Sequence, residues 1–150
     1  MIRIYIIADS FKDFNTPIFE YNKRLWKNVS IIKIKPSKKG SHQDIINKDT
    51  EKVNSILKKL DWDNILLSTT WISFNTENFT NKVISKSFNK WKQINFIIWW
   101  AFWLNENNLI NINLKLKLSD FTLPHLIALT VLLEQIYRSY QILRNRNYHY

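Results

Sequence analysis

The sequence predicts a single α/β domain in which a largely parallel sheet is flanked by helices. Short apolar runs of strand length alternate along the chain with longer segments whose apolar residues recur at helical spacing. At 150 residues the chain is long enough for one domain that buries about two-thirds of its unfolded surface. The expected elements are taken below in chain order.

The first half of the chain is expected to hold three strands and two helices. Thr16-Pro17 begins the first helix, which runs to Leu25, and Asp44 can cap the second. A basic loop with the sole glycine, Gly40, precedes the second helix. The three strands are apolar runs at residues 2–8, 29–34 and 65–67.

The second half continues the alternation. A third helix is marked by apolar residues on one face, namely Phe79, Val83, Ile84 and Phe88. Residues 94–98 form a buried strand. The final strand alternates leucine with lysine over residues 114–118, which predicts one wetter face.

The stretch from Leu118 to Arg138 is the centre of the expected fold. Pro124 follows a short polar turn and stands where helices commonly start. A surface helix needs only one apolar stripe, so we expect this helix to be covered twice, by its own sheet and by a second copy of the chain. Apolar residues lie on nearly every side of it: Leu126, Ile127, Leu129, Val131, Leu132, Leu133 and Ile136.

The net charge of +10 and the pI near 9.8 favour an anionic partner, most simply nucleic acid; a lysine-rich solvated surface is the alternative. The absence of cysteine excludes disulfides and thiolate metal sites, and the three histidines show no ligand spacing. No cleavable signal segment is visible, and the longest apolar run, residues 126–133, is far shorter than a membrane span. We therefore expect a soluble cytoplasmic protein without metal.

Glycine and tryptophan are used abnormally. Glycine occurs once, where average usage of about 7% predicts roughly ten. The seven tryptophans all fall at predicted helix ends, turns or strand-to-loop junctions, where glycine is common. We hypothesise that these positions are glycines encoded by UGA; the alternative is an aromatic platform on which bases stack. The positions are Trp26, Trp62, Trp71, Trp91, Trp99, Trp100 and Trp103.

With glycine at those positions, residues 94–104 read INFIIGGAFGL. The chain also carries EYNKRL at residues 20–25, FTLPH at residues 121–125, EQIYR at residues 134–138 and NYH at residues 147–149. Over essentially its whole length the sequence resembles the RlmH family of SPOUT-class methyltransferases, and FTLPH and EQIYR are its most specific motifs.

The resemblance implies one SPOUT domain over residues 1–150, an α/β knot whose donor site and deep C-terminal trefoil knot span about residues 64–143. It implies a homodimer paired through the knot helices. It also implies an enzyme that uses S-adenosyl-L-methionine to methylate N3 of a pseudouridine in 23S rRNA of the assembled ribosome.

Three pieces of the chain match the family's donor site. They would lie at the carboxyl ends of strands, where open α/β sheets bind ligands, and an adenine ring needs an apolar slot there. Tryptophans at the family's Gly-Gly position would fill that slot. The matching residues are Leu67, then Trp99 and Trp100, then Leu118, Ser119, Asp120, Phe121, Thr122 and Leu123.

On the substrate side the resemblance points to Tyr148 and His149 in the terminal NYH and to Arg138 in EQIYR. Arg138 is four residues after Glu134, so a local ion pair is the simplest interpretation; contact with the substrate or the partner chain is the alternative. His125 follows a proline at a helix start, where a structural role is expected before a catalytic one. The sequence does not identify the general base.

Three positions depart from the family pattern: Leu129 replaces an arginine, Ser68 an acidic residue and Asn147 a proline. These changes put substrate contacts in doubt, so either the RNA is held differently or the enzyme is weaker. RNA phosphates would be bound by the basic loop and the tail. The basic residues concerned are Lys35, Lys38, Lys39, Arg144 and Arg146.

Two other functions remain open. The first is a catalytically inactive ribosome- or RNA-binding protein of the same fold, with a blocked donor pocket. The second is a nucleotide-binding module of ordinary doubly wound topology.

Overall fold

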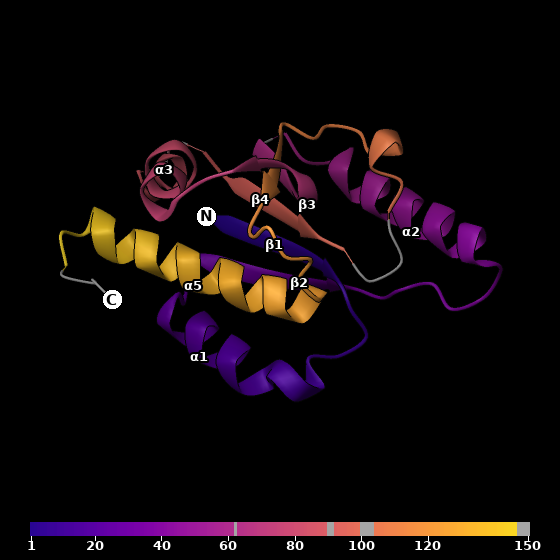
Figure 1. The fold of residues 1–150 in the computed structure, drawn as a ribbon, viewed down its shortest axis with the longest axis horizontal. Helices are drawn as coiled ribbons and strands as arrows, with labels where there is room; N and C mark the ends of the chain where they lie inside the picture. Colours follow the sequence, from indigo (N-terminus) through magenta and orange to yellow (C-terminus); the bar gives the residue numbers. More distant parts are fainter. Residues whose placement is uncertain (62, 90–91, 100–103, 147–150) are drawn as a thin grey trace.

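A computed structural model describes residues 1–61, 63–89, 92–99 and 104–146. It confirms the predicted α/β domain: five strands run parallel in one sheet, in the order β2-β1-β4-β3-β5 (Figure 1). The strands are β1 (Ile2–Ile7), β2 (Val29–Ile34), β3 (Asp63–Ser73), β4 (Ile94–Ile98) and β5 (Leu114–Lys117).

Helices occupy both faces of the sheet. Three consecutive segments form one continuous helix with a π-helical middle: α3 (Thr76–Phe79), η2 (Thr80–Ile84) and α4 (Ser85–Phe88). The other long helices are α1 (Asn15–Arg24), α2 (His42–Leu57) and α5 (His125–Leu143), and two 3₁₀ turns are η1 (Lys12–Phe14) and η3 (Glu106–Asn108).

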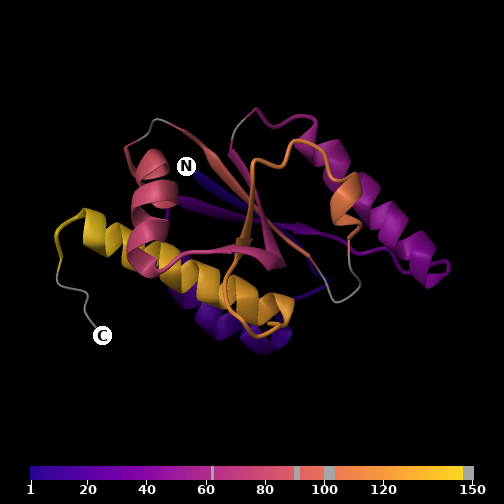
Figure 2. The same cartoon turned by 45° about the horizontal axis from the view of Figure 1, so that its top comes forward.

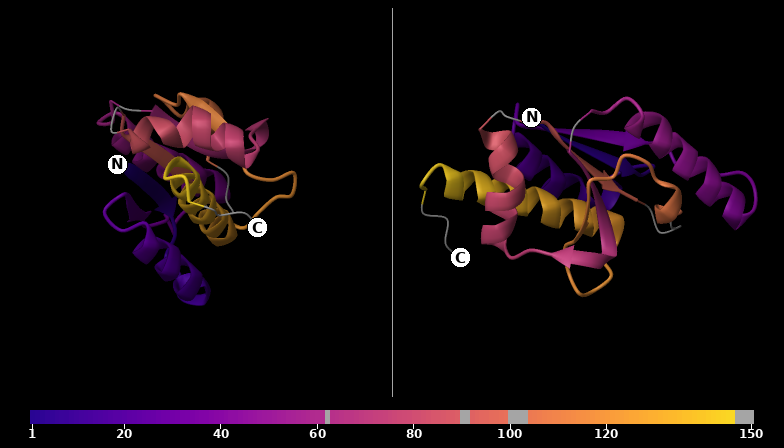
Figure 3. Two further views of the ribbon diagram at one scale, coloured as in Figure 1. Left: turned by 90° about the vertical axis from the view of Figure 1, so that its left-hand side faces the viewer. Right: turned by 90° about the horizontal axis from the view of Figure 1, so that it is seen from above.

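Successive side chains of a strand point to opposite faces, so the sheet has a core on each side. On the larger side, Ile4 and Phe96 of the sheet pack with α1, α5 and the α3–α4 helix. On the smaller side, Tyr5 and Ile97 pack with α2 through Val53. Figures 2 and 3 show α1 and α5 side by side, with α2 on the other side of the sheet.

The strand order β2-β1-β4-β3-β5 matches neither of the two common doubly wound orders, 3-2-1-4-5-6 and 2-1-3-4-5. Here β4 lies between β1 and β3, and β5 pairs with the outer edge of β3. The chain therefore does not have the topology of an ordinary doubly wound nucleotide-binding module. The trefoil knot stays a prediction, as does its range at about residues 64–143.

The third strand was predicted too short. It covers Asp63–Ser73 rather than residues 65–67 alone, and its pairing with β5 shifts register between Leu67 and Ile72. The extension forms because β5 supplies backbone partners at Leu116 and Lys117 to Ile72 and Ser73. Trp71, predicted in a loop, therefore lies in β3, with 53% of its surface exposed.

The cap of α2 also differs from the expectation. Ser41 is the N-cap residue, and Asp44 completes a capping box: its backbone N–H donates to Ser41 Oγ at 3.2 Å, and its Oδ2 accepts from Ser41 N at 2.9 Å. The hydrogen bond from the Ser41 hydroxyl is the main cause that lowers the pKa of Asp44. Asp44 thus stabilises the helix start from its third position rather than from the cap itself.

The helix α5 finds much of its cover within its own chain. Leu129, Leu132 and Ile136 are fully buried toward the sheet, as predicted. Its flanks contact α1 and the α3–α4 helix, where the hydroxyls of Thr80 and Ser139 lie 2.8 Å apart. The sequence predicts that a second copy of the chain covers the side of this helix away from the sheet, and in the structure these intrachain helices supply part of that cover.

Candidate functional site

A pocket opens at the carboxyl end of β4, beside the middle of β3 and along the segment that follows β5. Six of the residues matched to the donor site line it: Leu67, Trp99, Leu118, Ser119, Phe121 and Leu123. The rest of its wall consists of Ser68, Thr69, Ile98, His125 and Ala128.

Parallel pairing brings these segments together. Leu66 pairs with Ile97 and Leu67 with Leu116, so the carboxyl ends of β4 and β5 lie beside residues 67–69 of β3, which itself continues to Ser73. The chain then turns back toward α5, and the turn is held by the Phe121 N–H, which donates to Ser119 Oγ at 3.0 Å. Residues separated by more than fifty positions in the sequence therefore share one wall.

The lining chemistry fits an adenosine-type ligand, with leucine and isoleucine side chains beside the hydroxyls of Ser68 and Ser119. The space is narrow. The cavity measures about 60 Å³, and about 420 Å³ when its open mouth is included. Pockets for drug-sized ligands measure roughly 300–1,000 Å³, so only the mouth-inclusive volume reaches this range. The half-buried indole of Trp99 is the largest side chain in the wall.

Three other predicted residues do not line the pocket. Asp120 and Thr122 belong to the same turn but are exposed, and Asp120 is hydrogen-bonded to Lys117 Nζ at 2.7 Å. That hydrogen bond, followed by the charge of Lys117, lowers the pKa of Asp120. The third is Arg138. Trp100, Tyr148 and His149 fall outside the described residues.

Arg138 lies ten residues along α5 from Ala128, the nearest wall residue of this helix, or about 15 Å at 1.5 Å per residue. Its Nε and Nη2 donate to Glu134 Oε1 at 2.9 and 2.6 Å, and Glu134 Oε2 accepts from Gln135 Nε2 at 2.6 Å. The simpler interpretation, a local ion pair, is thus present. Within one chain Arg138 is remote from the pocket.

His125 joins α5 to the pocket. It is the first residue of the helix, follows Pro124 at the N-cap and lines the cavity. Burial in this wall lowers the pKa of His125, because it penalises the charged imidazolium. A neutral imidazole is therefore favoured at neutral pH.

A polar group that sequence reasoning missed stands behind the pocket. Ser68 Oγ donates to Glu106 Oε1 at 3.0 Å, and Glu106 Oε2 accepts from Lys115 Nζ at 3.1 Å. Glu106 thus brings a carboxylate from η3 to Ser68, the position at which the resemblance leads us to expect an acidic residue. No local signal in the sequence links positions 38 residues apart.

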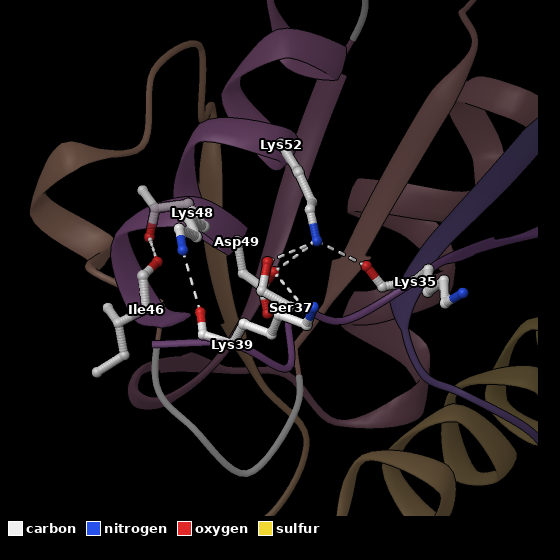
Figure 4. Close-up of polar contacts among 8 residues, drawn as sticks. Lys35, Ser37, Lys39, Ile46, Lys48, Asp49 and Lys52 are labelled. Atoms are coloured by element: carbon white, nitrogen blue, oxygen red, sulfur yellow. Dashed lines mark hydrogen bonds and ion pairs between the residues drawn. The ribbon is translucent and has the colours of Figure 1, made fainter. Parts of the chain in front are cut away.

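The basic loop before α2 is held rigidly by that helix (Figure 4). Lys52 Nζ donates to Lys35 O at 2.9 Å, to Ser37 Oγ at 2.7 Å and to Asp49 Oδ1 at 3.0 Å. Lys48 Nζ donates to Lys39 O at 3.0 Å. Both helix lysines are therefore used to fix the loop backbone.

The loop's own lysines differ in what they contact. Lys38 forms an ion pair with Asp9 at 2.9 Å, which offsets its charge. Lys35 and Lys39 contribute their backbone oxygens to the contacts of Figure 4, and the ammonium group of Lys35 points away from them. Lys35 and Lys39 are thus better placed than Lys38 to meet phosphates.

Every helix in the described ranges is too short or too polar to span a membrane. The same ranges hold no group of three or more histidine, aspartate or glutamate side chains arranged to bind a metal.

Comparison with known proteins gives consistent matches over the full chain. A family model described as "Predicted SPOUT methyltransferase" matches residues 1–149. The chain is 33% identical over 141 residues to the ribosomal RNA large subunit methyltransferase H of Fusobacterium nucleatum, covering 92% of this chain and 91% of the relative. For the protein of that name from Mycoplasma capricolum the identity is 34% over 155 residues, covering 99% and 98%. For that of Dictyoglomus thermophilum it is 33% over 153 residues, covering 99% of each chain.

Proposed function

The chain belongs to the SPOUT methyltransferase family, and from this premise we propose that it methylates large-subunit ribosomal RNA with S-adenosyl-L-methionine as the donor. The substrate atom is N3 of a pseudouridine in 23S rRNA, presented by the assembled ribosome in the cytoplasm. One observation carries the proposal: six of the residues matched to the donor site, from three distant segments, line a single pocket.

The pocket residues bind and orient the donor. Leu67, Leu118 and Leu123 offer apolar surface to an adenine ring, while Ser68 and Ser119 offer hydroxyls. Bound S-adenosylmethionine supplies an electrophilic methyl group on a sulfonium. The protein's contribution is chiefly to hold N3 of the base in line with that methyl group and to exclude water.

Transfer forms a bond from N3 to the methyl carbon, breaks the sulfur–methyl bond and requires the N3 proton to leave. A general base or a water path takes this proton. Tyr148 and His149 are proposed to close over the base from the C-terminal tail. His125, a neutral imidazole in the pocket wall, is the alternative acceptor.

The direct test uses ribosomes from cells that lack the gene, incubated with purified protein and S-adenosylmethionine. Mass spectrometry of the large-subunit rRNA should show one methyl group added to a pseudouridine. An unmodified rRNA, in a preparation that binds ribosomes normally, would instead support the inactive RNA-binding alternative. The methyltransferase names of the relatives give that alternative no support.

The tryptophans at the strand end are tested separately. We expect the chain with tryptophan at both positions to bind S-adenosylmethionine poorly, because the indole of Trp99 is part of the wall of a narrow pocket. Calorimetry should show tighter binding when Trp99→Gly and Trp100→Gly are combined. Equal affinity of the two proteins would refute the crowding argument, and UGG codons at these positions would refute the proposed codon reassignment.

A homodimer paired through α5 completes the proposed enzyme. Partly exposed apolar residues remain on or near this helix, including Ile142 at 37% exposure and Phe121 at 83%. Such a pairing would bring the partner's Arg138 region and basic loop nearer to the pocket. Sedimentation equilibrium should give twice the chain mass, and a monomer at micromolar concentration would contradict the dimer.

A further inference from the structure

Ser68 lies in the pocket wall, and its hydroxyl proton is already used in a hydrogen bond. It is 6% exposed, and its Oγ donates to Glu106 Oε1 at 3.0 Å. A serine hydroxyl has one proton and two acceptor lone pairs. The remaining contacts, Thr70 Oγ1 at 3.4 Å and Thr70 N at 3.5 Å, are long. Toward a ligand in the pocket, Ser68 is therefore left chiefly as a hydrogen-bond acceptor.

The carboxylate that takes this proton is itself fixed. Glu106 Oε2 accepts from Lys115 Nζ at 3.1 Å, and the two side chains are only 20% and 21% exposed. The ammonium of Lys115 also lies 5.0 Å from the centre of the Trp71 ring. Partial burial strengthens such charge-assisted contacts and holds the carboxylate in one place.

Backbone geometry delivers the three residues from different elements. Ser68 lies in β3 just after Leu67, at the register shift. Glu106 is the first residue of η3, and Lys115 lies in β5, where it pairs with Leu66 of β3. The cluster thus forms only when the sheet edge and the segment before β5 are assembled.

We propose that Ser68 is a donor-binding residue that accepts a hydrogen bond from a hydroxyl or amino group of the adenosine moiety, and that Glu106 is the positioning residue that orients it. The inference rests on the proposed function, because it names a contact within that donor pocket. The ribose hydroxyls and the adenine amino group carry the N–H and O–H donors of an adenosine, so they share the required chemistry.

The test measures binding of S-adenosylhomocysteine by calorimetry. It is run on the chain as printed and on the Trp99→Gly/Trp100→Gly background, each with Ser68→Ala, Glu106→Gln or both. Each single change should weaken binding about fivefold, the value of one hydrogen bond. The double change should weaken it no more than the stronger single change, because both remove the same contact. Glu51→Gln, an exposed carboxylate on α2, is the matched control and should leave binding unchanged.

Ligand analogues separate orientation from a merely structural role. The 2′-deoxy and 3′-deoxy forms of S-adenosylhomocysteine each lack one ribose hydroxyl, and the inosine form has a carbonyl and an N1–H in place of the amino group and the bare N1 of adenine. One of them should bind the Ser68 protein about fivefold more weakly than the parent ligand, and this difference should vanish in Ser68→Ala. A structural role would instead weaken all ligands alike and lower the thermal midpoint.

The outcomes are distinct. Parent binding with no effect of either substitution, or with independent effects that multiply, overturns this inference alone. Failure of both backgrounds to bind S-adenosylhomocysteine overturns the proposed function and this inference with it.

Discussion

Gly40 has a backbone conformation that demands glycine, whereas the described tryptophans do not. Its φ is +119°, and an added Cβ would lie 2.8 Å from Asp44 Cβ. The non-glycine residues with positive φ in the described ranges are Lys27, Asn111 and Asn145. We expected a positive φ at Trp26, just past the end of the first helix, but the residue with positive φ there is the next one, Lys27. The structural case for glycine at Trp99 therefore rests on space in the pocket rather than on φ.

His125 is expected to make stability fall in mild acid. Burial lowers its folded-state pKa below the usual 6.5. Above pH 6.5 the histidine is neutral in both states, so it does not lower the free energy of unfolding. As pH falls from 6.5 through the lowered value, stability is lost because the unfolded chain binds the proton more readily. The free energy of unfolding, measured with urea at about pH 8 and about pH 5.5, should fall less between the two pH values for His125→Gln than for the unchanged chain.

The exposed His42 at the start of α2 gives the control for this measurement. His42→Gln should preserve the acid-induced drop in the free energy of unfolding. An equal drop in all three proteins would show that His125 does not cause it.

At the scale of elements, the start of α2 and the loop before it behave as one unit. The carboxylate of Asp49, with its side chain only 7% exposed, accepts from Ser37 N at 2.9 Å and from Lys52 Nζ at 3.0 Å. The lysine in turn binds the backbone oxygen of Lys35. Ordering the loop before the RNA arrives reduces the entropy lost on binding.

Asp49→Ala should destabilise the protein by about 1–3 kcal/mol, because the half-buried Ser37 N–H loses its acceptor and the Lys52 ammonium loses its carboxylate partner. Urea unfolding measures this cost. Hydrogen exchange should also become faster at residues 37–39, while residues of β1 keep their protection. Glu51→Gln on the exposed face of α2 should change neither observable, and unchanged exchange in Asp49→Ala would contradict the role of Asp49 as the loop's anchor.

At the scale of the molecule, the lysines that contribute to the net charge of +10 differ in how far nearby carboxylates offset their charge. Lys38, Lys52 and Lys115 are neutralised locally by carboxylates. The loop residues Lys35 and Lys39 are better candidates for long-range attraction to RNA. Affinity that depends on such residues should fall steeply with salt.

Replacing Lys35 and Lys39 by alanine should weaken ribosome binding and reduce the steepness of its salt dependence. Each lost phosphate contact lowers the slope of log affinity against log salt by about 0.7–0.9. Filter binding at several salt concentrations measures both quantities. Lys59→Ala, just past the opposite end of α2, should leave the slope unchanged. An unchanged slope in the double variant would instead mean that the RNA binds elsewhere on the protein.

The local pattern of the sequence determined most elements and the family. The strands at residues 29–34 and 94–98 were predicted with their observed bounds, because an apolar run of strand length between polar turns is a local signal. The motifs FTLPH and EQIYR pointed to the family, and six of the residues matched to its donor site meet at one pocket.

Only the tertiary structure decided the strand order, the length of β3 and the partners of the pocket residues. The extension of β3 depends on pairing with β5, and the contact of Ser68 with Glu106 spans 38 residues. The distance of Arg138 from the pocket likewise follows from the direction of α5. These features arise from long-range pairing and packing, whose energies depend on which segments meet in space and leave no periodic trace along the chain.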